Sequence, residues 1–350
     1  MCSSDLTKFG DEAAGMFFTR DGLEQATRPA VADHHARRLR EAGARAVVDL
    51  GCGIGSDALA FLRAGLDVVA VERDPGTAAV ARANLAARTD LPARAEVVCA
   101  DAEVVAADLL GPGVAAFCDP ARRSSRGRLW RVADFTPSWD FVTALLAGDR
   151  PAGVKLGPAL PHSLVPEEVE AEWVTAGTDT VEVTLWAGPG ASAATDVALL
   201  LPTDGRDPSR LGVPRPPAGE PADPAPTGQL GRYLYEPDGA VIRARGLPAL
   251  AAQLGARLVD PQIAYLTGDE RVDSPFAIAF EVLEVLPYDL KALRRWCRSA
   301  GVGTLEIKKR GVDVDPAELR RRLGSHGSAS ATLVLTRTPQ GTRTLHVRRL

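Results

Sequence analysis

The sequence predicts an α/β protein, in which an open, mostly parallel sheet covered by helices is followed by a second, smaller α+β domain. Three observations predict it. Short apolar stretches alternate with helical ones from residue 46 to about residue 123, which is the pattern of a doubly wound sheet. A glycine-rich turn links the first predicted strand to its helix. A proline-rich stretch then separates this acidic half of the chain from a half that ends in a strongly basic region.

The glycine-rich turn follows the apolar run 47–50 and contains Gly51, Gly53 and Gly55. Glycine adopts backbone angles that other residues avoid, and it lets a ligand lie against bare backbone. The helix predicted over residues 57–64 would direct its free N–H groups toward whatever lies over the turn. The sequence therefore predicts a nucleotide-type ligand site here.

Three acidic residues accompany successive apolar strands. Asp49 precedes the first glycine, Glu72 ends the strand 67–72, and Asp101 follows the strand predicted near residues 96–99. In an open parallel sheet, an acid at the end of the second strand lies beside the glycine turn and can accept hydrogen bonds from a ribose. The alternative is that each acid only caps a strand end. That interpretation is adequate for a single acid, but it does not account for three acids on successive strands. The turn fits neither GxGxxG nor GxxxxGK[ST].

The turn Asp-Leu-Gly-Cys-Gly-Ile-Gly, followed by these acids, resembles the cofactor site of class I S-adenosylmethionine-dependent methyltransferases. The resemblance implies a Rossmann-like sheet, mostly parallel, with an antiparallel β-hairpin at its edge. It implies that Asp49 and the three turn glycines hold the methionine part of S-adenosyl-L-methionine. It assigns the ribose to Glu72 and the adenine to Asp101 with Ala102.

The predicted fourth strand, 114–118, ends in Asp119 and Pro120. The resemblance implies that these two residues orient the methyl acceptor. Methyl transfer from a sulfonium needs alignment more than a dedicated base. Amino-group methyltransferases carry an Asp, Asn or Ser, two prolines and an aromatic ring at this position. This chain lacks the second proline and the ring.

Two arginines follow the acceptor motif directly. We expect Arg122 to act at the reaction centre and Arg123 to bind substrate, because a guanidinium binds phosphate or carboxylate well. The alternative is an ion pair with Asp134. Trp130 or Trp139 is a candidate for the missing ring, and the alternative role for each is core packing.

Composition indicates a cytoplasmic protein without a metal centre. The formal net charge is -4, and the five cysteines are scattered without a CxxC pair, so neither a metal cluster nor a disulfide framework is expected. No signal-peptide pattern and no apolar run of membrane-spanning length is visible. No Cys–His or Ser–His constellation favours covalent catalysis. His34 and His35 are interpreted as surface residues.

Residues 1–202 are expected to form the methyltransferase domain, with residues 1–45 as a helical cover. In the cover we expect one helix over residues 23–40, with Thr27 as its cap and Pro29 in its first turn. Further helices are expected over 75–88 and 139–147. The remaining strands are expected at 154–156, at 173–175, and as an antiparallel pair formed by 181–187 and 197–201.

Residues 203–230 are expected to be a proline-rich linker, and residues 231–350 a second domain. In that domain helices are expected at 240–256, 287–300 and 315–323. Strands are expected at 276–285, 304–308, 332–336 and 344–348, with the last two paired across a turn.

The end of the chain is strongly basic. Residues 291–350 contain 14 Lys and Arg against 4 Asp and Glu, and a sustained cationic excess is typical of nucleic-acid binding. The densest cluster is Lys308, Lys309 and Arg310, which we expect to bind RNA. The alternative is a solvated helix face and domain rim.

Two further resemblances complete the prediction. Residues 17–27 resemble the trimethylguanosine-synthase-like branch of methyltransferases, and residues 233–239 with 305–313 resemble the THUMP-like domain, which implies RNA as partner. The predicted function is methylation of a base nitrogen in tRNA or rRNA. The alternatives are a small-molecule or protein methyltransferase, and a non-catalytic RNA module that binds the cofactor.

Overall fold

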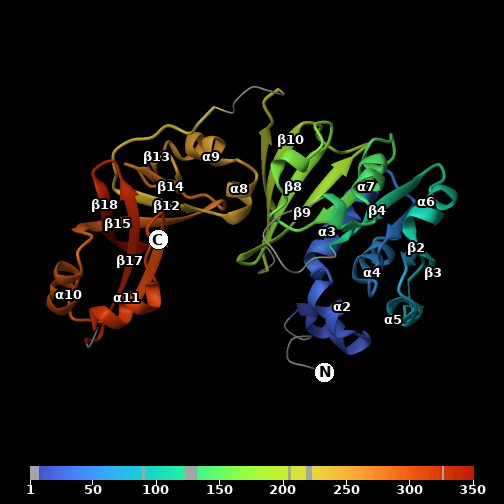
Figure 1. Ribbon diagram of the computed structural model, residues 1–350, viewed down its shortest axis with the longest axis horizontal. Coiled ribbons are helices and arrows are strands. Elements are labelled where there is room, and N and C mark those ends of the chain that lie inside the picture. The colour runs from blue at the N-terminus through green and yellow to red at the C-terminus, as the bar shows by residue number, and fades with distance from the viewer. Residues whose placement is uncertain (1–7, 89–90, 123–131, 204–205, 218–222, 325–326) are drawn as a thin grey trace. The chain divides into compact units, whose positions relative to one another are not determined.

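The computed structural model describes residues 8–88, 91–122, 132–203, 206–217, 223–324 and 327–350. The chain divides into two compact units, Met1–Arg215 and Pro216–Leu350 (Figure 1). Each unit has its own sheet. Among the described residues, none of the helices combines the length and apolar composition needed to span a bilayer.

The sheet of the first unit has the strand order β11-β10-β8-β9-β7-β4-β1-β2-β3. Strands β3, β2, β1, β4 and β7 run parallel, whereas β9 is antiparallel to both β7 and β8. The predicted α/β class, with a mostly parallel sheet and an antiparallel edge, is confirmed. The strands are β1 (Ala46–Leu50), β2 (Asp67–Glu72), β3 (Ala95–Cys99), β4 (Val114–Cys118), β7 (Ala152–Leu156), β8 (Glu170–Ala176), β9 (Asp179–Ala187), β10 (Thr195–Leu201) and β11 (Ser209–Pro214).

The antiparallel edge differs from the prediction. Residues 181–187 and 197–201 do not pair with each other, because β8 lies between β9 and β10 and is parallel to β10. The hairpin is formed by β8 and β9 across Gly177. β8 is buried at every position, as expected of a strand inside a sheet. β11, which pairs antiparallel with β10, lies within the stretch predicted as linker.

Helices flank the strands of this sheet. α3 and α4 pack together, and their apolar side chains share one core cluster with Val47 of β1, Val68 of β2 and Phe117 of β4. Asp74 caps α5 by accepting from the Thr77 N–H. The helices are α2 (Arg20–Gln25), α3 (Pro29–Glu41), α4 (Ser56–Arg63), α5 (Pro75–Ala86), α6 (Ala102–Leu109) and α7 (Trp139–Leu146), with 3₁₀ turns η1 (Gly10–Gly15), η2 (Val132–Asp134) and η3 (His162–Leu164) and the short pair β5 (Ala121–Arg122) and β6 (Phe135–Thr136).

The helix expected over residues 23–40 is two helices, α2 and α3. Pro29 opens α3 at its first position, where its missing N–H costs nothing. Thr27 does not cap α3, since Arg28 is the N-cap residue. The Thr27 hydroxyl instead donates to Asp57 Oδ2 at 2.5 Å. Thr27 lies in the break between the two helices, and its side chain is buried against α4.

The prediction that His34 and His35 are surface residues is wrong. His35 is 0% exposed, and its ring lies between two carboxylates, with Nδ1 at 2.8 Å from Asp57 Oδ1 and Nε2 at 2.7 Å from Glu182 Oε1. Burial alone would lower the pKa of His35, but Glu182 and Asp57 outweigh it and raise the pKa to about 10. His35 is therefore an imidazolium that ties α3 to α4 and β9.

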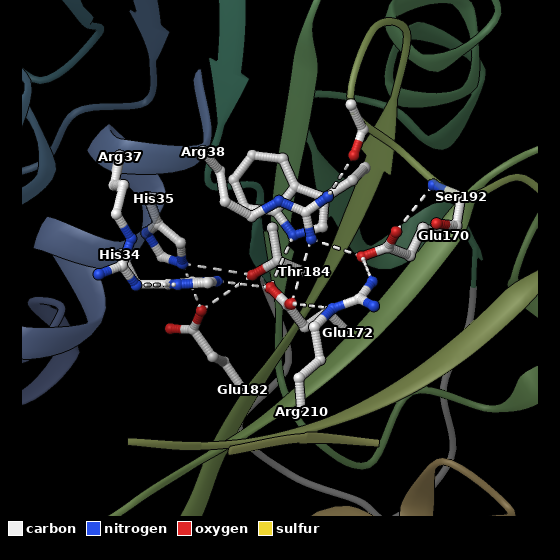
Figure 2. A network of polar contacts seen from close by, with 12 residues as sticks. His34, His35, Arg37, Arg38, Glu170, Glu172, Glu182, Thr184, Ser192 and Arg210 are labelled. Carbon is white, nitrogen blue, oxygen red and sulfur yellow. Dashed lines mark hydrogen bonds and ion pairs between the residues drawn. The ribbon is translucent and has the colours of Figure 1, made fainter. Parts of the chain in front are cut away.

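A second buried ionic network ties α3 to β8 and β11 (Figure 2). Glu170 and Glu172 of β8 are both 0% exposed. Arg38 pairs with both carboxylates, His34 Nε2 lies 2.8 Å from Glu172, and Arg210 of β11 lies 2.9 Å from Glu170. Each carboxylate thus has at least two basic partners, which is what keeps a buried charge tolerable.

The second unit has a mostly antiparallel sheet of order β13-β14-β12-β15-β18-β17-β16, in which only the β16–β17 pairing is parallel among the strands described. The predicted β17–β18 pair and the helix capped by Asp315 are confirmed. The helix expected over 240–256 is interrupted at residues 244–246. The elements are β12 (Tyr233–Pro237), α8 (Gly239–Arg243), α9 (Leu247–Leu254), β13 (Arg257–Asp260), β14 (Ile263–Gly268), β15 (Ala277–Pro287), α10 (Leu290–Ser299), β16 (Val302–Arg310), α11 (Pro316–Leu323), β17 (Ala329–Thr338) and β18 (Gly341–Arg349).

The second sheet has apolar clusters on both faces. On one face α10 and α11 cover a cluster that includes Leu305 and Leu333. On the other face Leu234, Phe280 and Val334 belong to a second buried cluster. Arg337 of β17 reaches Asp260 of β13, with Nε at 3.1 Å and Nη2 at 3.3 Å from its carboxylate. This pair joins β13, at one end of the strand order, to β17, the second strand from the other end.

His35→Gln should destabilise the first unit by about 3–5 kcal/mol at pH 7, because Asp57 and Glu182 lose the charge between them. A histidine whose pKa rises from its ordinary value to about 10 on folding adds stability that is complete at low pH and is lost as pH rises toward that value. Urea unfolding from pH 7 to pH 10 should therefore show falling stability in the wild type and a flatter profile in His35→Gln.

His346→Gln, in the second unit, serves as the control and should keep the wild-type slope over this range, because the pKa of His346 is lowered by burial. Parallel profiles of the wild type and His35→Gln would contradict the imidazolium assignment.

Candidate functional site

A pocket opens at the carboxyl ends of β1, β2, β4 and β7, and the glycine turn, α2, the start of α3 and part of β9 also line it. In open α/β sheets, ligands bind in this position. The sequence-predicted residues that line the pocket are Gly51, Gly53, Glu72, Asp101, Ala102, Asp119 and Pro120.

The backbone of the turn requires its glycines. Gly51, Gly53 and Gly55 have φ angles of +88°, +56° and +87°, in the left-handed region that favours glycine. A Cβ on Gly51 would lie 3.0 Å from the backbone oxygen of Asp119, whereas a Cβ on Gly53 would meet nothing within 4 Å. Gly53 therefore presents bare backbone to the pocket, and Gly55 is the N-cap residue of α4.

Glu72 is tied to the glycine turn. Its Oε2 accepts from the Gly53 N–H at 3.1 Å, and its Oε1 accepts from the Asp74 N–H at 2.9 Å. Each carboxylate oxygen can accept a further hydrogen bond. The side chain is therefore held in place by backbone donors and still has acceptor capacity toward the pocket.

Asp101 serves two purposes. Its Oδ1 accepts from the Glu103 N–H at 3.0 Å and so caps α6, which is the capping alternative considered from the sequence. The same residue is exposed and lines the pocket beside Ala102. Capping therefore leaves Asp101 available to a ligand.

Asp49 lies beneath the turn rather than in the pocket wall. It is 1% exposed, and its Oδ2 has no hydrogen-bond partner among the described residues. Burial, together with the neighbouring Asp57 and Asp119 carboxylates, raises the pKa of Asp49 well above its usual range. This shift favours the neutral carboxylic acid, which would contribute to the site as a hydrogen-bonding group.

The acceptor motif forms one corner of the pocket. Asp119 follows β4, its backbone N–H donates to Leu50 O at 3.2 Å, and its side chain is 35% exposed. Its Oδ2 lies 2.6 Å from Nζ of Lys155 on β7. Burial, together with the Asp57 and Glu182 carboxylates, raises the pKa of Asp119, although the Lys155 ammonium lowers it.

Lys155 was not expected from the sequence. It is 7% exposed, and its Nζ donates to Thr27 Oγ1 at 2.7 Å and lies 3.8 Å from Asp57. Burial would lower the pKa of Lys155, but Asp119, Asp57 and Glu182 outweigh it and hold the pKa above its ordinary value. A single signal was available: a lysine interrupts the apolar strand 152–156.

The residues after Pro120 are described only in part. Arg122 pairs with Phe135 through the backbone, as part of β5, but its side chain lies outside the described part of the structure. Arg123 and Trp130 also lie outside it. The Trp139 ring packs 5.2 Å from that of Phe135 and is 9% exposed, so its role is in the core.

The segment before the sheet forms another wall of the pocket. Asn84 of α5 is buried, and its side chain donates to Phe17 O and Ile54 O and accepts from the Phe17 N–H. Gly22 of α2 packs so closely on Ile54 that a Cβ would lie 2.4 Å from it. Lys8 Nζ donates to the carbonyls of residues 23 and 24 at the end of α2. These contacts fasten the segment to the glycine turn.

The predicted basic cluster of the second unit does not form a single patch. Lys308 Nζ lies 2.7 Å from Glu236 Oε2, and Arg310 lies 4.0 Å from the same residue, whereas Lys309 is exposed. Seven other basic residues are exposed on α10 and α11, which lie beside one another (Figure 1). We call this set the basic helix face: Lys291, Arg294, Arg295, Arg298, Arg320, Arg321 and Arg322.

Family models match both units. A methyltransferase domain model matches residues 48–108, which include the glycine turn and Glu72. A model described as THUMP domain-like matches residues 277–349.

The chain is also similar to named proteins over most of its length. Two uncharacterized S-adenosylmethionine-dependent methyltransferases of Mycobacterium tuberculosis, from strains CDC 1551 / Oshkosh and ATCC 25618 / H37Rv, are 34% identical over 331 residues, covering 93% of this chain and 85% of theirs. A solved structure from Porphyromonas gingivalis W83, assigned as a methyltransferase, has a TM-score of 0.82 at 23% identity and covers 98% of this chain and 86% of that one; this likeness supports the fold. With a pocket of this geometry and relatives of this identity and coverage, the chain belongs to the S-adenosylmethionine-dependent methyltransferases and carries a C-terminal THUMP-like domain.

Proposed function

We propose that the chain methylates a base nitrogen of tRNA or rRNA. The observation that carries the proposal is the acceptor corner, where a partly exposed carboxylate, Asp119, faces the pocket at the end of β4. The cationic second unit supports RNA as the molecule that bears the acceptor.

The residues of the pocket fit S-adenosyl-L-methionine. Gly53 leaves an open cradle where a side chain would project, and Glu72 keeps acceptor capacity suited to the two hydroxyls of a ribose. Asp101 and Ala102 would lie beside the adenine. When bound, the cofactor supplies an electrophilic methyl group on a sulfonium.

The protein's own part in methyl transfer is alignment. An acceptor amine can donate an N–H to the Asp119 carboxylate, and this contact would orient the nitrogen lone pair toward the methyl group. Effective alignment of this kind lowers the barrier by several kcal/mol without covalent catalysis. Pro120 fixes the backbone beside the carboxylate, while α2 and the start of α3 line the pocket.

The pre-sheet helices are also the basis for proposing the trimethylguanosine-synthase-like branch. α2 and the start of α3 line the pocket on the acceptor side, together with Lys155 and Glu182. A cover in this position would shape the acceptor site. The branch remains a proposal about substrate, since the cofactor residues are common to class I enzymes.

The basic helix face is the proposed contact to RNA. Arginine and lysine neutralise phosphates and release bound counterions, so the affinity depends steeply on salt. Arg295 and Arg298 of α10 are exposed and suit phosphate contacts. Lys309 is also available, whereas Lys308 and Arg310 would first have to leave Glu236.

Glu72→Ala should weaken S-adenosyl-L-methionine binding ten- to a hundredfold, because hydrogen bonds to a charged group contribute about 1.5–3 kcal/mol. Asp119→Ala should leave the dissociation constant nearly unchanged and abolish turnover. Isothermal titration calorimetry and radiolabel transfer to RNA measure the two effects separately. Equal cofactor affinity in Glu72→Ala and wild type would refute the ribose assignment.

Bulk tRNA should bind at low salt and dissociate as salt rises, with a slope that reports the number of phosphate contacts. Replacing Arg295 and Arg298 by Gln should reduce that slope by up to about 2, since each contact contributes roughly 0.7–0.9. The matched control is Arg45→Gln with Arg94→Gln, an exposed pair in the first unit, which removes the same charge. Equal slopes in both variants would exclude the basic helix face, and no binding at low salt would favour a small-molecule or protein substrate.

A further inference from the structure

We propose that Lys155 is a positioning residue for methyl transfer: its ammonium fixes one oxygen of Asp119 and leaves the other oxygen directed at the acceptor. The inference rests on the proposed role of Asp119 as the acceptor-orienting residue. None of the sequence patterns or family resemblances assigns a role to this lysine.

The contacts of Lys155 leave it little freedom. An ammonium has three donors; two of them are engaged by Asp119 Oδ2 at 2.6 Å and Thr27 Oγ1 at 2.7 Å, and Asp57 Oδ2 lies 3.8 Å away. The side chain of Lys155 is 9% exposed, whereas that of Asp119 is 35% exposed. The carboxylate therefore meets the substrate, and the lysine holds the carboxylate.

The partners of Lys155 are themselves fixed. Thr27 donates to Asp57, which also accepts from His35. His35 is clamped by Glu182 on its other side. The ammonium is consequently held by Thr27, which precedes α3, and lies close to Asp57 of α4, so its contact with Asp119 does not depend on one flexible side chain.

Lys155 also offsets the negative charge around Asp119. The charged and titratable groups facing Asp119 are Asp57 from α4, Glu182 from β9, Asp49 from β1 and Lys155 from β7, with His35 of α3 behind Asp57. Among the side chains that the structure describes, those that face Asp119 directly are, apart from Lys155, acidic. Without the ammonium, burial and these acidic neighbours would favour a protonated Asp119. A protonated carboxyl group cannot both accept a hydrogen bond from the acceptor amine and later take up the proton of that amine.

Beyond alignment, an ionised Asp119 would serve the proton balance of the reaction. As the nucleophilic nitrogen takes the methyl group, a nitrogen–carbon bond forms and the carbon–sulfur bond breaks, with its electron pair left on sulfur. The nitrogen then carries one proton in excess. The free oxygen of Asp119 can receive this proton and release it to water through the open pocket.

The first test is the pH profile of turnover in the full-length chain, with saturating cofactor and total tRNA as substrate. Lys155→Met should lower kcat ten- to a hundredfold at pH 7 and move the acid limb upward by about one pH unit or more, with the cofactor dissociation constant unchanged. Lys155→Arg should restore the limb toward wild type, because it keeps the charge. A Lys155→Met profile with the wild-type limb would overturn the proposal.

The second test needs no substrate, so it still decides the proposal if tRNA is not methylated. A double-mutant cycle of Lys155→Met and Asp119→Asn, read by urea unfolding, should show a coupling of at least about tenfold in the unfolding equilibrium constant. The control cycle pairs Lys155→Met with Asp108→Asn, an exposed acid on α6, and should show none. Equal coupling in both cycles would mean that Lys155 acts on the whole fold and not on Asp119.

Discussion

The imidazolium of His35, buried between the carboxylates of Asp57 and Glu182, is the interaction on which the site depends. An unpaired buried charge costs several kcal/mol, so the three groups are stable only when α3, α4 and β9 are all in place. From Asp57 the contacts continue through Thr27 and Lys155 to the acceptor carboxylate. The position of the acceptor corner thereby depends on the packing of α3, α4 and β9. The glycine turn contributes the cofactor half of the pocket.

The cofactor half is also the part that could be predicted from the sequence. Its signals are local: strands β1 to β4 are short apolar runs, the glycines occupy positions with positive φ, and Glu72 directly follows apolar residues. Such features need only neighbouring residues to be recognised. The acceptor motif was predictable for the same reason, because Asp119 and Pro120 follow the fourth strand directly. In the second unit, the β17–β18 pair and the helix capped by Asp315 carry equally local signals.

What could not be predicted depends on partners that are distant in the sequence. His35 meets Glu182 across 147 positions, and Lys155 meets Thr27 across 128. The local sequence around a histidine or lysine does not indicate such a distant partner. Without one, these residues are expected at the surface. The predicted pairing of β9 with β10 was wrong for the same reason, because the neighbours of a strand are selected by pairing between residues distant in the sequence. The split between α2 and α3 is different, because its signal is local: proline is tolerated only in the first turn of a helix, so Pro29 marks the start of α3 rather than a position inside one longer helix.

Asn84 joins the backbone of the segment before the sheet to the backbone of the glycine turn. A ligand that rigidifies the turn must then also reduce the local opening of that segment, since both share the same hydrogen bonds. Hydrogen exchange of the backbone amides near Phe17 would therefore slow when a ligand occupies the pocket beside the glycine turn. By reciprocity, removing the residues before the sheet would lower the affinity of the pocket for that ligand.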